Sequence, residues 1–336
     1  MRACLEVMRE ASDSSEICRP TSQGQPEGYN TKSHDDGLVH AILGRLAGNL
    51  VASRIVATAH LTPATALVTV LQPSSGWRAL DLRELWRYRE LMYFLAWRDV
   101  KVRYKQTALG AAWAVLQPVL AMLIFSVFFG RLAHIPSDGL PYPLFAFAGV
   151  LPWTYFANAA TLSGGSLVAN TNLVSKVYFP RLIVPIAAVL AGLIDLAIGF
   201  GILLVLLAAF RVAPGPQLLL VPLFVLLAIA TALGVGIWLS ALDVQYRDVR
   251  YAIPFLIQVW LFATPVVYPA SLVPENYRAL LGLNPMAGVV EGFRWALLGT
   301  APPGSLLLVS VAVVAALLLS AVFYFRRMER TFADVI

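Results

Sequence analysis

Charged residues are scarce in this sequence. Only 13% of its 336 residues are Asp, Glu, Lys or Arg, whereas 59% are hydrophobic. A water-soluble domain rarely carries so little charge, so the composition predicts an all-α integral membrane protein. The net charge of +6 does not indicate nucleic-acid binding, because the basic residues cluster beside apolar segments, as membrane topology requires.

Residues suited to metal binding or nucleophilic chemistry are also few. The two cysteines, Cys4 and Cys18, predict neither a disulfide framework nor a zinc site. Each of the four histidines is expected on a solvated surface. The sequence contains no GxxxxGK[ST] phosphate-binding loop and no HExxH or GxSxG motif. We therefore predict no catalytic residue, no metal, no bound cofactor and no ATP hydrolysis by the chain itself.

One uncharged run fixes the expected topology. Arg98, Lys101, Arg103 and Lys105 precede it, and the run from Gln106 to Gly130 carries no charge. At about 1.5 Å per residue, it is long enough to cross the ~30 Å hydrocarbon core of a bilayer. Lys and Arg are retained on the cytoplasmic side, so the segment before the run is expected in the cytoplasm.

Hydropathy predicts six spans, at about residues 107–130, 142–162, 182–210, 217–241, 253–268 and 304–325. With the N-terminus inside, few basic residues from Arg78 onward fall on the far side, namely Arg131, Arg211, Arg278 and Arg294. This asymmetry agrees with the positive-inside rule. Both termini are therefore expected in the cytoplasm, with residues 326–336 as a tail.

The sequence before the first span divides into two parts. Residues 1–70 form a disordered or poorly defined extension, whose apolar second half is either a surface helix or translated sequence upstream of the true start. Residues 71–105 predict a cytoplasmic amphipathic helix, which lies in the headgroup layer or, alternatively, binds a soluble partner. Its apolar stripe is Leu82, Leu85, Trp86, Met92, Tyr93, Ala96, Trp97 and Val100. Its interfacial residues are Trp86, Trp97, Arg98, Asp99 and Lys101.

The segment from Tyr268 to Gly304, between the last two spans, is too polar and too often broken by Pro and Gly to cross a membrane. It nevertheless contains apolar stretches. Either it forms two short re-entrant helices that dip back from the outer face, or it is an ordinary external loop. Irregular backbone at membrane depth must be covered by protein or water.

Asp195 is the clear charge within a predicted span. An acid at membrane depth is a functional candidate by default. No ionisable partner is visible in another span, so a structural hydrogen bond to a neighbouring helix is favoured over a proton relay. The same absence argues against an ion-coupled secondary transporter.

Aromatic residues gather in the first two spans. Each ring either packs in the core or lies in an interfacial belt, and collectively the rings are alternatively suited to line a channel that contacts sugars. The set comprises Phe125, Phe128, Phe129, Trp153, Tyr155 and Phe156. Two short loops, Asn170–Leu182 and Leu242–Tyr251, mix charged and aromatic residues. They bind a soluble partner or simply carry topology-setting charge.

Several segments together resemble a known family. They are ELWRYRELMYFLAWRDVKVRYKQTALGAAWAVLQP, LVSKVYFPRLIVP, LDVQYRDVRY, LNPMAGVVEGFRWALLG and the closing RMERTFADVI. They look like the permease subunit of type-2 ATP-binding-cassette exporters, and within these the polysaccharide and polyol-phosphate exporters, which include O-antigen and teichoic-acid permeases. The resemblance covers about Leu71 to Ile336, and residues 1–70 depart from it.

This resemblance implies a homodimer of permeases in the bacterial inner membrane, paired with a separate ATPase subunit that uses ATP and Mg. The expected activity is export of a lipid-linked polysaccharide along a partly aromatic-lined pathway. The alternatives are a membrane glycosyltransferase or polymerase, and an exporter of a small drug or lipid. The expected ATPase-coupling residues are Lys176, Tyr178, Phe179, Pro180, Arg181, Asp243, Tyr246, Arg247 and Asp248. The expected outer gate comprises Tyr268, Asn284, Pro285, Glu291 and Arg294.

Overall fold

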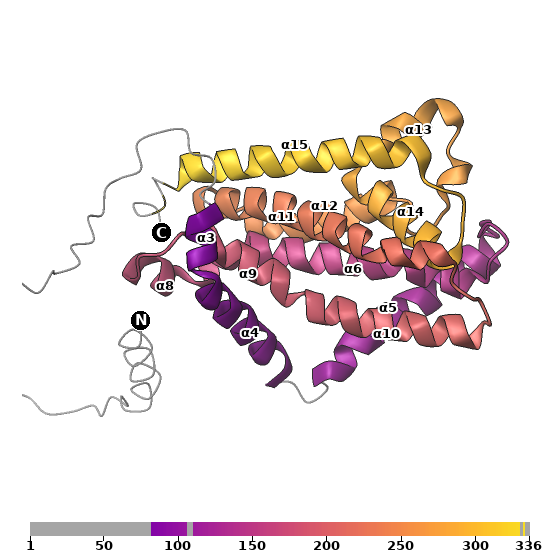
Figure 1. Ribbon diagram of the computed structural model, residues 1–336, viewed down its shortest axis with the longest axis horizontal. Helices are drawn as coiled ribbons and strands as arrows, with labels where there is room; N and C mark the ends of the chain where they lie inside the picture. Colours follow the sequence, from indigo (N-terminus) through magenta and orange to yellow (C-terminus); the bar gives the residue numbers. More distant parts are fainter. Residues whose placement is uncertain (1–81, 106–109, 330–331, 333–336) are drawn as a thin grey trace, which may run out of the picture. The chain divides into compact units, whose positions relative to one another are not determined.

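The structure is a computed structural model that describes residues 82–105, 110–329 and 332 (Figure 1). These residues form helices and connecting turns with no strand among them, which confirms the predicted all-α class for the part of the chain described. The predictions for residues 1–70, and for the portion of the amphipathic helix before Leu82, lie outside the described residues.

The helices alternate with short turns along the chain. Their bounds are α3 (Leu82–Arg87), α4 (Arg89–Lys105), α5 (Gly110–Phe125), the π-helical η2 (Ser126–Leu132), α6 (Tyr142–Gly164), α7 (Ser166–Ala169), α8 (Thr171–Lys176), α9 (Ile183–Ala191), α10 (Leu193–Ala209), the 3₁₀ turn η3 (Pro216–Leu220), α11 (Val221–Gln245), α12 (Val249–Ala263), the 3₁₀ turn η4 (Ala270–Leu272), α13 (Glu275–Gly282), α14 (Pro285–Leu298) and α15 (Gly304–Met328).

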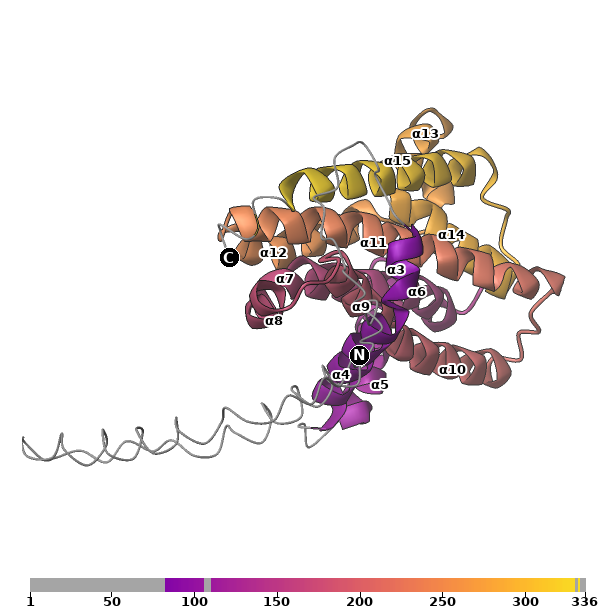
Figure 2. The same cartoon turned by 60° about the vertical axis from the view of Figure 1, so that its left-hand side comes forward.

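The long helices lie side by side as a bundle built around α6 and α11. Helix α15 packs along α11, and α14 packs against α6, α11 and α15. Both views place α7 and α8 where α15 finishes and α13 where α15 begins (Figures 1 and 2). We call these two ends of the bundle the α8 end and the α13 end.

Among the residues that the structure describes, four helical stretches are long and apolar enough to cross a membrane: Ala112–Leu132, Ile183–Ala209, Pro216–Gln245 and Gly304–Met328. They correspond to four of the six predicted spans. The other two predicted spans coincide with α6 and α12. Helix α6 has 23 residues but carries Pro, Trp, Tyr, Thr and Asn, which lower its hydropathy. Helix α12 is apolar but has only 15 residues, fewer than the ~20 typical of a spanning helix.

The helices differ from the predicted spans in local details. The stretch Ile183–Ala209, which matches the predicted span 182–210, is divided at Gly192 into α9 and α10. The predicted span 253–268 ends at Ala263, because Thr264 precedes Pro265 and adopts an extended conformation (φ −102°, ψ 139°). A residue before proline is disfavoured in the α region, so the helix stops there. Helix α15 continues to Met328, beyond the predicted start of the tail.

The buried residues form two clusters. The larger includes the inner faces of α6 and α11 and much of α14. The smaller lies at the α8 end and joins α4, α9, α11 and α15, with Phe179, Phe325 and Phe332 among its members. Helices α6 and α11 approach closely at Gly236, where an added Cβ would lie 2.5 Å from Ser163 Oγ and 2.6 Å from Ser163 Cβ. Small residues permit this kind of close contact between helices in a membrane.

Substituting Gly236→Ala is therefore expected to force α6 and α11 apart and lower the thermal unfolding temperature in detergent. Gly201→Ala in α10 is the matched control, because nothing lies within 4 Å of its added Cβ. Removing a helical glycine there should be neutral or stabilising by up to about 1 kcal/mol. Equal unfolding temperatures for the two variants would contradict the predicted contact.

Candidate functional site

The loop after α8 is partly exposed and partly anchored. Lys176 and Tyr178 are exposed, and 72% of the surface of Tyr178 is accessible. Phe179 and Pro180 are buried, and Phe179 belongs to the apolar cluster at the α8 end. Of the five residues predicted here for ATPase coupling, Lys176 and Tyr178 are therefore exposed at the surface, whereas Phe179 and Pro180 fix the loop to the bundle.

Arg181, the fifth of these residues, contacts the end of α15. Its guanidinium donates to the Glu329 carbonyl oxygen at 2.7 Å, and its backbone N–H donates to Glu329 Oε1 at 3.3 Å. Beyond Glu329, Phe332 packs edge-on against Phe325 with ring centroids 5.3 Å apart. The predicted coupling loop is thus held to the C-terminal end of the last helix. The site prediction omitted Glu329, although it lies in the closing segment RMERTFADVI that contributes to the family resemblance.

The turn between α11 and α12 also lies at the α8 end. Tyr246, Arg247 and Asp248 are exposed at its tip. Asp243, predicted with them, is instead buried, and its Oδ2 accepts from Arg250 at 3.2 Å. Asp243 therefore stabilises the turn from within, while the other three residues form its surface.

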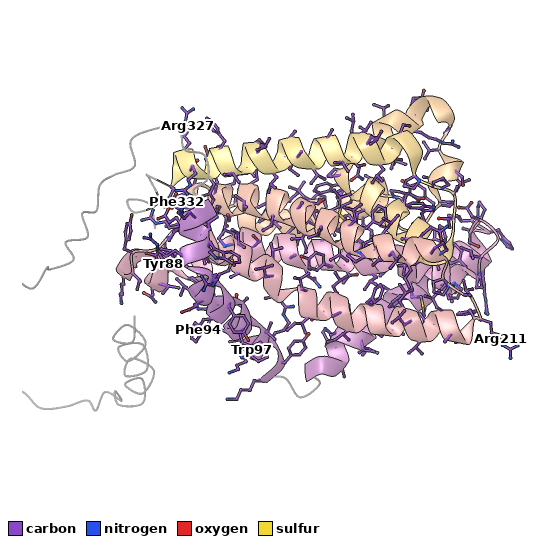
Figure 3. All side chains as sticks on the ribbon, viewed as in Figure 1. Tyr88, Phe94, Trp97, Arg211, Arg327 and Phe332 are labelled. Carbon is purple, nitrogen blue, oxygen red and sulfur yellow. The ribbon has the colours of Figure 1, made fainter. Side chains whose placement is uncertain are left out.

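The predicted apolar stripe has two parts on α3 and α4. Leu85, Met92, Ala96 and Val100 pack toward the bundle or are buried. Trp86, Tyr93 and Trp97 are exposed, and Figure 3 shows Phe94 and Trp97 on the part of α4 beyond the bundle. The buried part of the stripe is thus aliphatic, and its aromatic residues lie exposed beside it.

Polar contacts join α4 to the α7–α8 loop. Arg98 donates to Asn170 Oδ1 and to Asp99 Oδ1, each at 2.8 Å. The Lys101 ammonium lies 5.7 Å from the centroid of the Trp97 ring. Trp86 is contacted as well, because the Arg89 guanidinium lies 5.5 Å from the centroid of its ring, so all five predicted interfacial residues take part in specific contacts. Asn170, which the site prediction omitted, connects α4 with the start of α8.

Asp195 has two partners, both from the end of α4. Its Oδ2 accepts from the Arg103 guanidinium and its Oδ1 accepts from the Tyr104 hydroxyl. Burial and the bond to Asp195 raise the pKa of Tyr104 to about 12, so the hydroxyl remains a protonated donor at neutral pH. The expected structural contact is present, but it is an ion pair to the basic segment before the first span.

A cavity of about 720 Å³ opens beside this ion pair. Its walls come from the end of α4, the first part of α5, the middle of α6, Gly192 and the start of α10. The lining includes Trp113 and Gln117 from α5, and Thr154, Asn158 and Thr161 from α6. Its volume lies within the usual range for ligand pockets, ~300–1,000 Å³.

The predicted pathway aromatics occupy different surroundings. Tyr155 lines the cavity, and its hydroxyl donates to the Val189 carbonyl at 3.4 Å. Phe156 packs between Trp153 and Trp260, with centroid distances of 5.4 and 5.2 Å. The remaining three lie on or next to η2, where Phe125 and Phe129 pack against each other and Phe128 is exposed.

At the α13 end, the predicted gate residues surround the end of α12. Asn284 Oδ1 accepts from the backbone N–H of Met286 and so caps α14. The same oxygen accepts from Trp260 Nε1 at 3.0 Å, and Nδ2 donates to Thr264 Oγ1 at 2.9 Å. Pro285 occupies the first position of α14, where proline is favoured. The Asn284 side chain thus caps the start of α14 and forms hydrogen bonds with Trp260 and Thr264 at the end of α12.

Arg294 is the centre of these contacts and is fully buried. Its guanidinium donates to the carbonyl oxygens of Pro265, Val266 and Tyr268 at 2.6, 2.5 and 3.2 Å. Glu291 Oε1 lies 3.0 Å from the guanidinium. The ring of Phe145 faces the guanidinium, with its centroid 3.7 Å away. A side chain of α14 therefore satisfies the backbone that the Thr264–Pro265 break leaves without helical partners.

Comparison with known proteins gives a consistent family. The family model described as ABC-2 type transporter matches residues 90–298. The chain is 32% identical over 254 residues to the O-antigen export system permease protein RfbA of Myxococcus xanthus, covering 74% of this chain and 96% of the relative. It is 27% identical to a protein of the same name from Klebsiella pneumoniae, covering 61% and 79%. It is 25% identical to the polysialic acid transport protein KpsM of Escherichia coli, covering 60% and 78%.

Substituting Arg294→Met should destabilise the protein by about 3 kcal/mol or more, because it leaves Glu291 and three carbonyl oxygens without their buried partner. The expected readout is a large fall in the thermal unfolding temperature in detergent. The control is Arg278→Met on the neighbouring α13, since Arg278 is exposed. A fall of similar size in both variants would contradict the role assigned to the buried guanidinium.

Proposed function

The chain belongs to the ABC-2 type transporter family, and we propose that it is the permease subunit of an ATP-driven exporter of a lipid-linked polysaccharide. The observation that carries this proposal is similarity over nearly the whole length of an O-antigen export permease. A second export protein, named for polysialic acid, supports a cell-surface glycan as the substrate class. O-antigen or a similar glycan is the proposed cargo.

The proposed topology has six spans, with α6 and α12 crossing the bacterial inner membrane beside the four longer apolar stretches. The α8 end faces the cytoplasm in this arrangement. Basic residues at that end, among them Lys176, Arg247 and Arg327, support the assignment, whereas Arg211 lies at the opposite end (Figure 3). Both termini are then cytoplasmic, and α13 and α14 form re-entrant gate helices at the outer face.

Export is proposed to be driven by a separate ATPase subunit that binds ATP and Mg, because this sequence contains no phosphate-binding loop of its own. Its docking surface is formed by the exposed residues at the α8 end, above all Tyr178 and Tyr246. Aromatic residues exposed beside basic ones are common at protein interfaces. Two copies of the permease are proposed to form the translocation pathway between them.

The contacts at the α8 end suggest how movement passes from the ATPase to the membrane helices. Arg181 ties the docking loop to Glu329 at the end of α15, and Arg98 ties Asn170 to α4. When ATP binding draws the two ATPase subunits together, a displaced loop therefore carries α4 and α15 with it. The glycan then moves outward as the spans rearrange and the outer helices part.

Reconstitution tests the proposed function. The permease, co-purified with its proposed ATPase subunit, is expected to move lipid-linked glycan across the membrane of proteoliposomes only when ATP is supplied. The readout is glycan accessible to an external glycosidase. Sugar transfer by the purified chain alone would instead identify a glycosyltransferase. ATP-dependent movement of a small drug or phospholipid without glycan export would identify another cargo.

The docking assignment predicts that Tyr178→Ala weakens co-purification with the ATPase and lowers ATP-driven export, while the unfolding temperature remains unchanged. The matched control is Tyr277→Ala on α13, because Tyr277 is also highly exposed (60%) but lies at the other end of the bundle. Undiminished association of the Tyr178 variant, or equal losses in both variants, would refute the assignment.

A further inference from the structure

The cavity between α5, α6 and α10 contains polar side chains that the rest of the fold does not use. We propose that this cavity is a sugar-binding subsite within each chain, which holds a short run of pyranose residues of the glycan during export. The proposal rests on the proposed function, because it takes the transported glycan as its ligand.

Three lining side chains are unpaired. Gln117, Thr154 and Asn158 make no side-chain hydrogen bond to any other residue that the structure describes, although all three lie in predicted spans. Gln117 is exposed and Thr154 and Asn158 are partly exposed, so their polar groups are accessible from the cavity. Thr154 and Asn158 are four residues apart on α6 and so face the same way. Together the three offer two amides and one hydroxyl to whatever fills the cavity.

Trp113 adds an aromatic surface to this polar set. It is four residues before Gln117, so both lie on one face of α5, and 54% of its surface is exposed. The apolar face of a pyranose ring stacks on an aromatic ring, while its hydroxyl groups exchange hydrogen bonds with amides and hydroxyls. The combination of a rigid aromatic residue with converging neutral polar groups matches that chemistry.

The charge at the cavity favours a neutral part of the substrate. Arg103 is the basic residue of the lining, and its guanidinium is paired with Asp195. Since the two charges offset each other, the cavity offers no net positive field to a diphosphate. The sugar residues, rather than the charged lipid diphosphate that carries them, are therefore the part of the substrate that fits.

A lipid acyl chain is a poorer occupant for the same physical reason. It would leave the amides of Gln117 and Asn158 and the hydroxyl of Thr154 without partners. Thr161 shows the contrast within the same lining, because its hydroxyl already donates to the Ala157 carbonyl oxygen at 2.7 Å. The unpaired groups are thus a specific property of part of the cavity and not of every polar residue in α6.

The first test compares export by two variants of α6 in proteoliposomes that contain the ATPase. Replacing both Thr154→Val and Asn158→Leu removes the unpaired groups and should lower the rate of glycan export about tenfold. The control is Thr161→Val, which removes a hydroxyl already satisfied by its own helix and should leave export near the parent rate. Association with the ATPase and the unfolding temperature should be unchanged in both.

The second test identifies the occupant directly. A photo-reactive benzophenone amino acid in place of Trp113 is activated by light in cells that are making the glycan. Adducts that shift on gels and stain for carbohydrate would support the subsite. The subsite would be overturned by adducts with phospholipid alone or with a second copy of the chain alone. The absence of any adduct would overturn it as well.

The outcomes separate this inference from the proposed function. If the unaltered complex exports no glycan, the proposed function fails, whatever the variants do. If the unaltered complex exports glycan and the double variant of Thr154 and Asn158 exports it equally fast, only the subsite fails. Equal loss in the double variant and in Thr161→Val would also overturn the subsite, because it would indicate a general packing effect in α6.

Discussion

A polar group in an apolar environment must find a partner within the protein, and this constraint organises the bundle. Backbone N–H and C=O groups meet it by forming helices, so irregular backbone is costly wherever it is buried. The break at Thr264–Pro265 is an exception, and Arg294 compensates for it by donating to the carbonyl oxygens of Pro265, Val266 and Tyr268. The position of α14 inside the bundle follows from that requirement, because the buried guanidinium must reach the end of α12.

The same constraint distinguishes structural polar residues from functional ones. Thr161 and Thr231 donate to carbonyl oxygens one turn earlier in their own helices and so need no other partner. Asp195 on α10 forms an ion pair with Arg103 on α4, and this pair offsets the free-energy cost of placing the Asp195 carboxylate within a membrane span. Thr154 and Asn158 have no such arrangement. Their polar groups are open to the cavity, which is why they point to a ligand.

Much of the architecture could be predicted from the sequence because hydropathy and breakers act locally. The uncharged run after Lys105 and the hydropathy of the later spans predicted several helix positions to within a few residues. Contacts between distant segments could not be predicted in this way. The bonds of Arg103 to Asp195 and of Arg181 to Glu329 join residues 92 and 148 positions apart, and no periodicity encodes such a pairing. The cavity combines both kinds of information. The spacing of Trp113 and Gln117, and of Thr154 and Asn158, by one helical turn places each pair on one face of its helix, but the sequence does not show that the two faces meet.

The distant contacts also separate what holds the bundle together from what is free to move. At the α13 end, Arg294 of α14 donates buried hydrogen bonds to the carbonyl oxygens of Pro265 and Val266, which follow α12. If one partner moves away, the other is left as a buried polar group without a hydrogen bond. At the α8 end, the ties of Arg98 to Asn170 and of Arg181 to Glu329 are only partly buried, so water replaces them at lower cost. A force applied to the α8 loop therefore shifts α4 and α15 more easily than it opens α12 from α14. Opening the α13 end requires the buried hydrogen bonds of Arg294 to break together. Separation of α12 from α14 therefore has a higher free-energy barrier than movement of α4 and α15.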